Sequence, residues 1–227
     1  MEINIYNPAD DAKKISGFTI VVDVFRAFST SYYIDANKPA KYIIAESIEH
    51  AFELKGINPS PLLIGERAGY KIDGFDFGNS PSEINGRDFS ANTVIHTTTA
   101  GTKGLLAQPE KNEVVVGSFI NSRALLKYIS ENRIQTVNIY CTAEADKEYG
   151  EEDYAFAEYF RNKLLGKDGG FDEIVGKLRN GSGRVFHAGS FAPYADFLYC
   201  LDINRFDAVL KRKIVSGQSH GIELERI

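Results

Sequence analysis

The chain has 227 residues, enough for one large α/β domain or two small ones. Hydrophobic residues make up 43% of it and charged residues 25%, a balance typical of globular proteins that argues against a disordered chain. The formal net charge of −5 provides no general attraction to nucleic acid or to an anionic membrane, so local cations or a metal ion would have to hold an anionic substrate.

Neither a signal peptide nor a membrane-spanning segment is visible. The N-terminus lacks a basic region followed by an apolar one, and no apolar run approaches the roughly 20 residues that span a bilayer. We therefore expect a cytoplasmic protein without membrane or nucleic-acid partners, and a homodimer is left open. Cys141 and Cys200 have neither metal-ligand nor disulfide spacing, so both are expected to be buried, reduced thiols.

Strand-like runs alternate with helical patterns along the chain. Strands are predicted at residues 17–24, 41–45, 61–64, 93–96, 113–116 and 136–140. Helices are predicted at residues 47–55, 102–107, 122–131, 152–165, 172–178 and 194–201. This alternation predicts an α/β fold of three layers, α/β/α, around a mostly parallel or mixed sheet. We expect a single domain over residues 1–227, or two closely packed subdomains whose boundary is not visible.

The first candidate site segment follows the first long strand. In open α/β sheets, binding residues gather beyond the carboxyl ends of the strands. The Asp23 carboxylate could bind a hard cation there, while the Arg26 guanidinium could fork onto phosphate or sulfonate oxygens. The same two residues could equally form a structural ion pair or a helix cap, and their spacing alone does not decide.

The second segment, G-E-R-A-G-Y-K-I-D-G-F-D-F-G-N-S-P at residues 65–81, embeds charges among glycines. Glu66 and Arg67 again pair a metal ligand with an anion donor, and Asn79 and Ser80 belong to a tight turn that could open a binding loop. A plain surface loop would explain the glycines but not the embedded charges, so we favour a functional role.

The third segment is a strand that runs into hydroxyl residues and glycines before a helix. Backbone N–H groups at the helix start and threonine hydroxyls could hold a phosphate. The segment is not a Walker A loop, because G-x-x-x-x-G-K-[ST] is absent, and a threonine run can also reflect strand propensity. The substrate-binding candidates are Thr97, Thr98, Thr99, Gly101, Thr102 and Lys103.

An acidic group forms the fourth candidate. Glu148, Glu151, Glu152 and Asp153 precede or begin a predicted helix, where carboxylates can simply complement the helix dipole. They could instead complete a magnesium site, which needs few protein ligands. The structural alternative is stronger for Glu148 and Glu151. The histidines lack zinc-ligand spacing, and none is assigned a catalytic role: His50, His96, His187 and His220.

The motifs D-V-F-R-A, G-E-R-x-G-x-K-I-x-G-F-D-x-G-N-S-P and T-T-T-x-G-T, in this order, resemble the 2-phosphosulfolactate phosphatase family. The likeness extends over nearly the whole chain, including Cys141, the Glu152–Asp153 pair and the segment 200–202. It implies a magnesium-dependent acid phosphatase that converts (2R)-phospho-3-sulfolactate to 3-sulfolactate and phosphate on the route to coenzyme M. The family usually has asparagine where this chain has Ala100.

The residue chemistry is consistent with in-line attack by a metal-activated water. Mg²⁺ held by Asp23, Glu66 and one of Glu152 or Asp153 would help to generate the nucleophile. Arg26, Arg67, the 97–102 loop and Lys103 would neutralise charge on the transferring phosphoryl group.

Other phosphatase routes are less well supported. Phe25 stands where a D-x-D-x-T motif would have its second aspartate, and neither cysteine opens a C-x-x-x-x-x-R loop. The predicted partner is a small anionic phosphorylated metabolite. A nonhydrolytic metabolite-binding protein and a phosphoryl transferase that use the same pocket stay open as alternatives.

Overall fold

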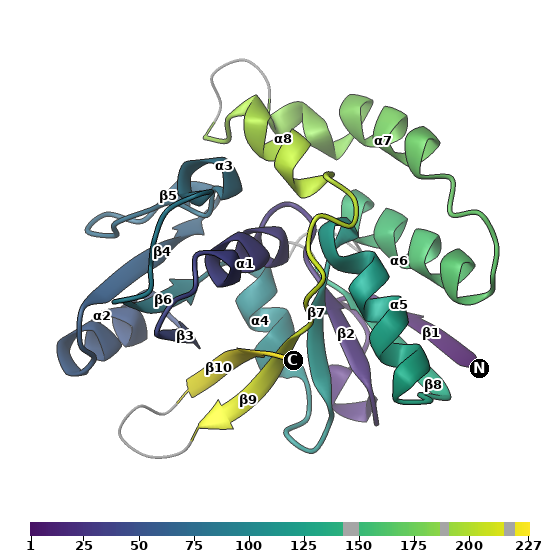
Figure 1. The fold of residues 1–227 in the computed structure, drawn as a ribbon, viewed down its shortest axis with the longest axis horizontal. Coiled ribbons are helices and arrows are strands. Elements are labelled where there is room, and N and C mark those ends of the chain that lie inside the picture. The colour runs from purple at the N-terminus through teal and green to yellow at the C-terminus, as the bar shows by residue number, and fades with distance from the viewer. Residues whose placement is uncertain (143–149, 187–190, 216–220) are drawn as a thin grey trace.

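A computed structural model of the chain describes residues 1–142, 150–186, 191–215 and 221–227 (Figure 1). Its strands form a ten-stranded sheet in the order β1-β8-β2-β7-β9-β10-β3-β6-β4-β5. The strands are β1 (Glu2–Tyr6), β2 (Thr19–Val22), β3 (Lys41–Ile44), β4 (Pro61–Arg67), β5 (Tyr70–Lys71), β6 (Thr93–Thr97), β7 (Val114–Gly117), β8 (Thr136–Cys141), β9 (Leu210–Val215) and β10 (Gly221–Arg226).

Helices of very different length connect these strands. They are α1 (Ala27–Ala36), α2 (Ile48–Ile57), α3 (Pro81–Ile84), α4 (Ala100–Ala107), α5 (Ser122–Glu131), α6 (Glu151–Leu164), α7 (Phe171–Asn180) and α8 (Tyr194–Cys200). Short 3-10 helices lie at Ala12–Lys14, Phe119–Asn121 and Ser182–Phe186. None of the helices in the described ranges combines the length and apolar character that crossing a membrane would require.

The sheet contains two parallel groups of strands that run in opposite directions. β1, β8, β2 and β7 are parallel to one another, as are β3, β6 and β4. The β9–β10 hairpin joins the groups through antiparallel pairings with β7 and β3. In a flat sheet this would place the carboxyl ends of β2 and β6 at opposite edges. These ends nevertheless meet, which the twist of a ten-stranded sheet allows.

Helices α1 and α4 lie between the two groups of strands (Figure 1). They pack in one apolar core with alternate residues of both groups, such as Val21, Val116, Ile44 and Val94. The residues between these positions face the other way, because successive side chains of a strand point to opposite faces. On that outer side, α5 and α6 cover the first group and α2 covers the second. The predicted α/β fold, with helices on both faces of a mixed sheet, is thus confirmed.

Each strand and helix predicted from the sequence is present, with ends shifted by a few residues. The sequence patterns did not indicate β1, β5, β9, β10, α1 or α3. Helix α1 escaped notice because its residues from Ala27 to Ile34 are all buried, so it has no polar face to produce a helical period. Cys141 and Cys200 are buried free thiols, as predicted, and burial raises the pKa of each.

Candidate active site

A cavity of about 400 Å³ lies where the carboxyl ends of β2 and β6 meet. Four chain segments that the sequence singled out contribute to its wall. The lining residues from these segments are Asp23, Phe25, Arg26, Glu66, Gly69, Asn79, Thr99, Ala100, Glu151, Glu152 and Asp153. The four segments therefore meet at one cavity, although β2 and β6 belong to groups of strands that run in opposite directions in the sheet.

Two buried aspartates form the floor of the site. Asp23 Oδ1 accepts a hydrogen bond of 2.9 Å from the Ala27 N–H at the start of α1. Asp153 Oδ1 accepts one of 2.7 Å from the Val24 N–H, and its Oδ2 accepts one of 3.1 Å from Thr142 Oγ1. Both carboxylates are thus fixed by the backbone or by a buried hydroxyl and keep lone pairs for a further ligand.

The electrostatics of these carboxylates are unfavourable in the protein alone. Burial raises the pKa of Asp23 from 3.8 to about 7, and the negative charges of Glu152 and Glu66 contribute to the rise, while the Ala27 N–H opposes it. Burial, Asp23 and Glu152 also raise the pKa of Asp153 well above its ordinary value. The charged groups that act most strongly on the two aspartates are therefore other carboxylates, a pattern that a bound cation would relieve.

Glu66 connects the second and third candidate segments. Its Oε1 accepts a 2.6 Å bond from the Thr99 N–H, and its Oε2 accepts bonds from Gly69 N at 2.8 Å and from Thr99 Oγ1 at 3.1 Å. The carboxylate thereby holds the β4–β5 turn against the start of α4. Gly69 has φ of 85°, and a Cβ there would lie 2.3 Å from the Phe191 ring, so only glycine fits this contact.

Arg26 is buried and lines the cavity. The Asp23–Arg26 ion pair considered from the sequence does not form. Arg26 Nη1 instead pairs with Asp196 of α8 at 2.8 Å, and Nη2 donates to the Gly69 carbonyl at 2.9 Å. Asp23 has the other role considered, since it caps the start of α1 through the Ala27 N–H.

The first turns of α1 and α4 meet beside Asp23. A Cβ placed on Gly101 would lie 2.7 Å from Ala27 Cβ and 2.9 Å from Asp23 Oδ2, so the predicted glycine serves close helix packing. Thr99 and Ala100 line the cavity at the start of α4. The first N–H groups of a helix lack intrahelical partners, and their positive end favours an anion.

Several predicted site residues do not reach the cavity. Arg67 donates to Glu66 O at 2.7 Å and to Thr97 Oγ1 at 3.0 Å, so it braces β4 against β6. Thr98 and Thr102 bond to each other, with Thr98 N donating to Thr102 Oγ1 and Thr102 N to Thr98 Oγ1. Lys103 is exposed and absent from the lining.

The turn at residues 79–80 divides between lining and support. Asn79 lines the cavity, and its buried Oδ1 has no hydrogen-bond partner among the described residues. Ser80 does not line it; its Oγ donates to Asp196 Oδ1 at 2.8 Å and accepts from the Glu83 N–H, which caps α3.

Of the acidic group, Glu152 and Asp153 line the cavity with Asp23. Glu151 also lines it, but its Oε2 accepts a 2.6 Å bond from the Ser182 N–H. This is a structural contact, although of another kind than the helix-dipole role considered from the sequence. Glu148, His187 and His220 lie outside the described residues. Buried His96 donates to or accepts from Tyr42 Oη through Nδ1, away from any assigned chemistry.

The sequence reasoning missed an apolar side of the cavity. Phe25, Val185, Phe186 and Phe191 line it together, and the Phe25 and Phe186 rings are 5.0 Å apart in an edge-on arrangement. Residues 185–191 showed no motif, so only the fold could reveal this wall. Thr142, next to the predicted Cys141, is a further missed member.

Among the described residues, no group of three or more His, Cys, Asp or Glu side chains has the arrangement of a ready-formed metal site. The donor chemistry of the cavity nevertheless fits Mg²⁺, which prefers carboxylate oxygens and keeps several water ligands. Asp23, Glu66, Glu152 and Asp153 supply such oxygens, and the charges of Glu152 and Glu66 add to the effect of burial in raising the pKa of Asp23.

Comparisons with known proteins agree with the motifs. A family model described as 2-phosphosulpholactate phosphatase matches residues 5–213. Several curated relatives carry the name "Probable 2-phosphosulfolactate phosphatase", among them the following three. The one from Caldicellulosiruptor saccharolyticus is 37% identical over 155 residues, 66% of this chain and 63% of that protein, so the chain spans just under two thirds of that relative.

The other two relatives are covered more fully. The protein of Clostridium perfringens is 34% identical over 171 residues, 72% of this chain and 68% of that protein. The protein of Carboxydothermus hydrogenoformans is 30% identical over 216 residues, 88% of this chain and 87% of that protein. With the family model covering most of the residues, the chain belongs to the 2-phosphosulpholactate phosphatase family.

Proposed function

We propose that this chain is a magnesium-dependent phosphatase that hydrolyses the phosphoester of a phosphorylated 2-hydroxy acid. The substrate that best agrees with the names of its relatives is 2-phospho-3-sulfolactate, which would be converted to 3-sulfolactate and phosphate. One observation carries the proposal: buried carboxylates, a buried arginine and two helix starts line a single cavity of about 400 Å³.

Asp23, Glu66 and one of Glu152 or Asp153 would hold the ion. When bound there, Mg²⁺ would offset the carboxylate charge, polarise a phosphoryl oxygen and lower the pKa of a bound water. The backbone and hydroxyl donors to Asp23, Glu66 and Asp153 keep these carboxylates oriented, as the outer partners of metal ligands usually do.

The remaining groups of the cavity would bind the substrate. Arg26 would donate N–H groups to phosphoryl oxygens, and the N–H groups at the start of α4 would add a second set of donors. Asn79, with its unpartnered amide oxygen, would bind a hydroxyl or water close to the acid end of the substrate. Arg67, Lys103, Thr98 and Thr102 would act indirectly, since they do not line the cavity.

The direct test is phosphate release from a panel of phosphorylated 2-hydroxy acids, with EDTA and after addition of Mg²⁺. We expect release only with the metal and highest turnover with 2-phospho-3-sulfolactate. Binding of these compounds without release, with or without Mg²⁺, would support a metabolite-binding protein instead. Phosphorylated product formed from an added acceptor alcohol would support a phosphoryl transferase. The cytoplasmic location, the role in coenzyme M synthesis and the homodimer stay predictions.

A further inference from the structure

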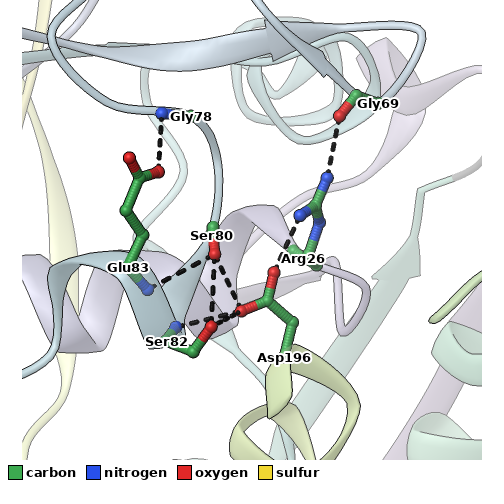
Figure 2. A network of polar contacts seen from close by, with 7 residues as sticks. All are labelled: Arg26, Gly69, Gly78, Ser80, Ser82, Glu83 and Asp196. Carbon is green, nitrogen blue, oxygen red and sulfur yellow. Dashed lines mark hydrogen bonds and ion pairs between the residues drawn. The ribbon is translucent and has the colours of Figure 1, made fainter. Parts of the chain in front are cut away.

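Asp196 is a fully buried carboxylate that no sequence motif indicated. It lies in α8, and its polar partners come from the β2–α1 connection and from the start of α3 (Figure 2). Asp196 Oδ2 pairs with Arg26 Nη1 at 2.8 Å. The side chain does not line the cavity, so it contacts the site only through the residues it bonds.

The second oxygen of Asp196 is saturated by the start of α3. Oδ1 accepts from Ser80 Oγ at 2.8 Å, from Ser82 Oγ at 2.6 Å and from Ser82 N at 3.0 Å. A buried ion pair is retained without a large penalty only when further hydrogen bonds satisfy its remaining lone pairs. The three bonds to Oδ1 meet that condition, and they hold the Asp196 carboxylate in place independently of Arg26.

Arg26 in turn is held on three sides. Asp196 binds Nη1, the Gly69 carbonyl binds Nη2, and the guanidinium carbon lies 5.6 Å from the centre of the Phe191 ring. A guanidinium has more N–H donors than these contacts use, so donors are left for an anion in the cavity. Its long, flexible side chain would otherwise adopt many rotamers, and ordering it during binding would weaken affinity.

We propose that Asp196 is a positioning residue that orients the Arg26 guanidinium for binding of a phosphoryl group. It also accepts a hydrogen bond from Ser80, whose neighbour Asn79 lines the same cavity. One carboxylate therefore holds in place two segments that line the cavity, the one with Arg26 and the one with Asn79. The inference rests on the proposed function for its role in turnover, but anion binding by Arg26 can be measured separately.

The experiment measures two quantities for each variant in saturating Mg²⁺: the dissociation constant of inorganic phosphate by calorimetry, and kcat and KM for the best phosphomonoester. Asp196→Asn keeps the shape and removes the charge. It should weaken phosphate binding about 10-fold or more, as expected for losing a hydrogen bond between charged groups. Asp202→Asn, on the exposed residue just beyond α8, is the matched control and should change neither quantity.

A double-mutant cycle separates positioning from simple structural support. If Asp196 acts through Arg26, the double variant R26K/D196N should bind phosphate no more weakly than R26K alone. Multiplied effects of the two substitutions would overturn the proposal, because Asp196 would then act independently of Arg26. Unchanged phosphate affinity in a folded D196N would overturn it as well.

Ser82→Ala keeps the test decisive should D196N not fold. Ser82 is half-buried, and the substitution removes one of the three hydroxyl and amide bonds to Asp196 Oδ1. It should weaken phosphate binding about 3-fold, and this effect should vanish in the R26K background. An effect that persists there would overturn the proposal. If the wild-type protein binds inorganic phosphate but hydrolyses no phosphoester, the proposed function is wrong. The binding measurements on the variants would still test the positioning role of Asp196.

Discussion

At the scale of single residues, Asp23 and Arg26 illustrate how one motif can combine structural and chemical roles. Asp23 caps α1 and also lies near other carboxylates. Arg26 does not pair with Asp23 and forms its ion pair with Asp196. Asp23 and Arg26, three residues apart in the chain, therefore have different partners and different roles. Because Asp23 lies among other carboxylates and does not pair with the arginine three residues further on, we propose it as a ligand of a cation.

Substitution of Asp23 by Asn should abolish magnesium-dependent turnover and leave the fold intact. The amide oxygen can still accept from the Ala27 N–H, so the cap survives, but one charged metal ligand is lost. Loss of several kcal/mol of charge stabilisation would lower kcat at least about a hundredfold. Steady-state kinetics over a Mg²⁺ titration check this, and near-normal turnover at high Mg²⁺ would show that the metal assignment is wrong.

At the scale of elements, the site depends on contact between the first turns of α1 and α4. These helices follow β2 and β6, which belong to oppositely directed groups of strands. Gly101 allows the contact, because a Cβ there would lie 2.7 Å from Ala27 Cβ. The close packing of the first turns of α1 and α4 beside the cavity therefore requires glycine at position 101.

Substitution of Gly101 by Ala should destabilise the protein and lower activity together. Overpacking typically costs about 1–3 kcal/mol, which lowers Tm by several degrees in a protein of this size. Gly176→Ala within α7 is the control, since a Cβ there meets nothing within 4 Å. It should raise stability by about 0.5–1 kcal/mol without changing kcat. Thermal unfolding and kinetics on both variants decide, and equal behaviour of the two would contradict the packing argument.

At the scale of the whole molecule, the buried carboxylates oppose folding when no cation is present. The folded protein holds the pKa of Asp23 at about 7 against an ordinary 3.8, mainly through burial. Between these values the folded state binds more protons than the unfolded state, so stability falls as pH rises through the window. A tenfold difference in proton affinity between the two states corresponds to about 1.4 kcal/mol of stability.

In EDTA, the unfolding free energy contributed by Asp23 should therefore fall between about pH 4 and pH 7, and Mg²⁺ should restore it at pH 8 by binding the folded state. Asp23→Asn is the control and should flatten this difference while making the metal-free protein more stable at pH 8. Denaturant unfolding across this range measures the effect. A wild-type protein that gains stability relative to D23N as pH rises in EDTA would refute it.

The sequence by itself determined the alternation of strands and helices and four of the segments that line the cavity. Local period and strand propensity are properties of adjacent residues, which is why the predicted elements from residue 17 to residue 201 are present. The motif at residues 65–81 likewise indicated Glu66 and Asn79, and the family assignment agrees.

Only the tertiary structure decided which of the singled-out side chains share the site. Arg67, Lys103, Thr98 and Thr102 lie within three positions of lining residues in the chain, yet none of them lines the cavity. Arg67, Thr98 and Thr102 form hydrogen bonds elsewhere, and Lys103 is exposed. Asp196, by contrast, is 170 positions from Arg26 and contacts it directly. Such contacts depend on how a twisted sheet brings distant segments of the chain together. No local pattern in the sequence indicates which distant residues will be in contact.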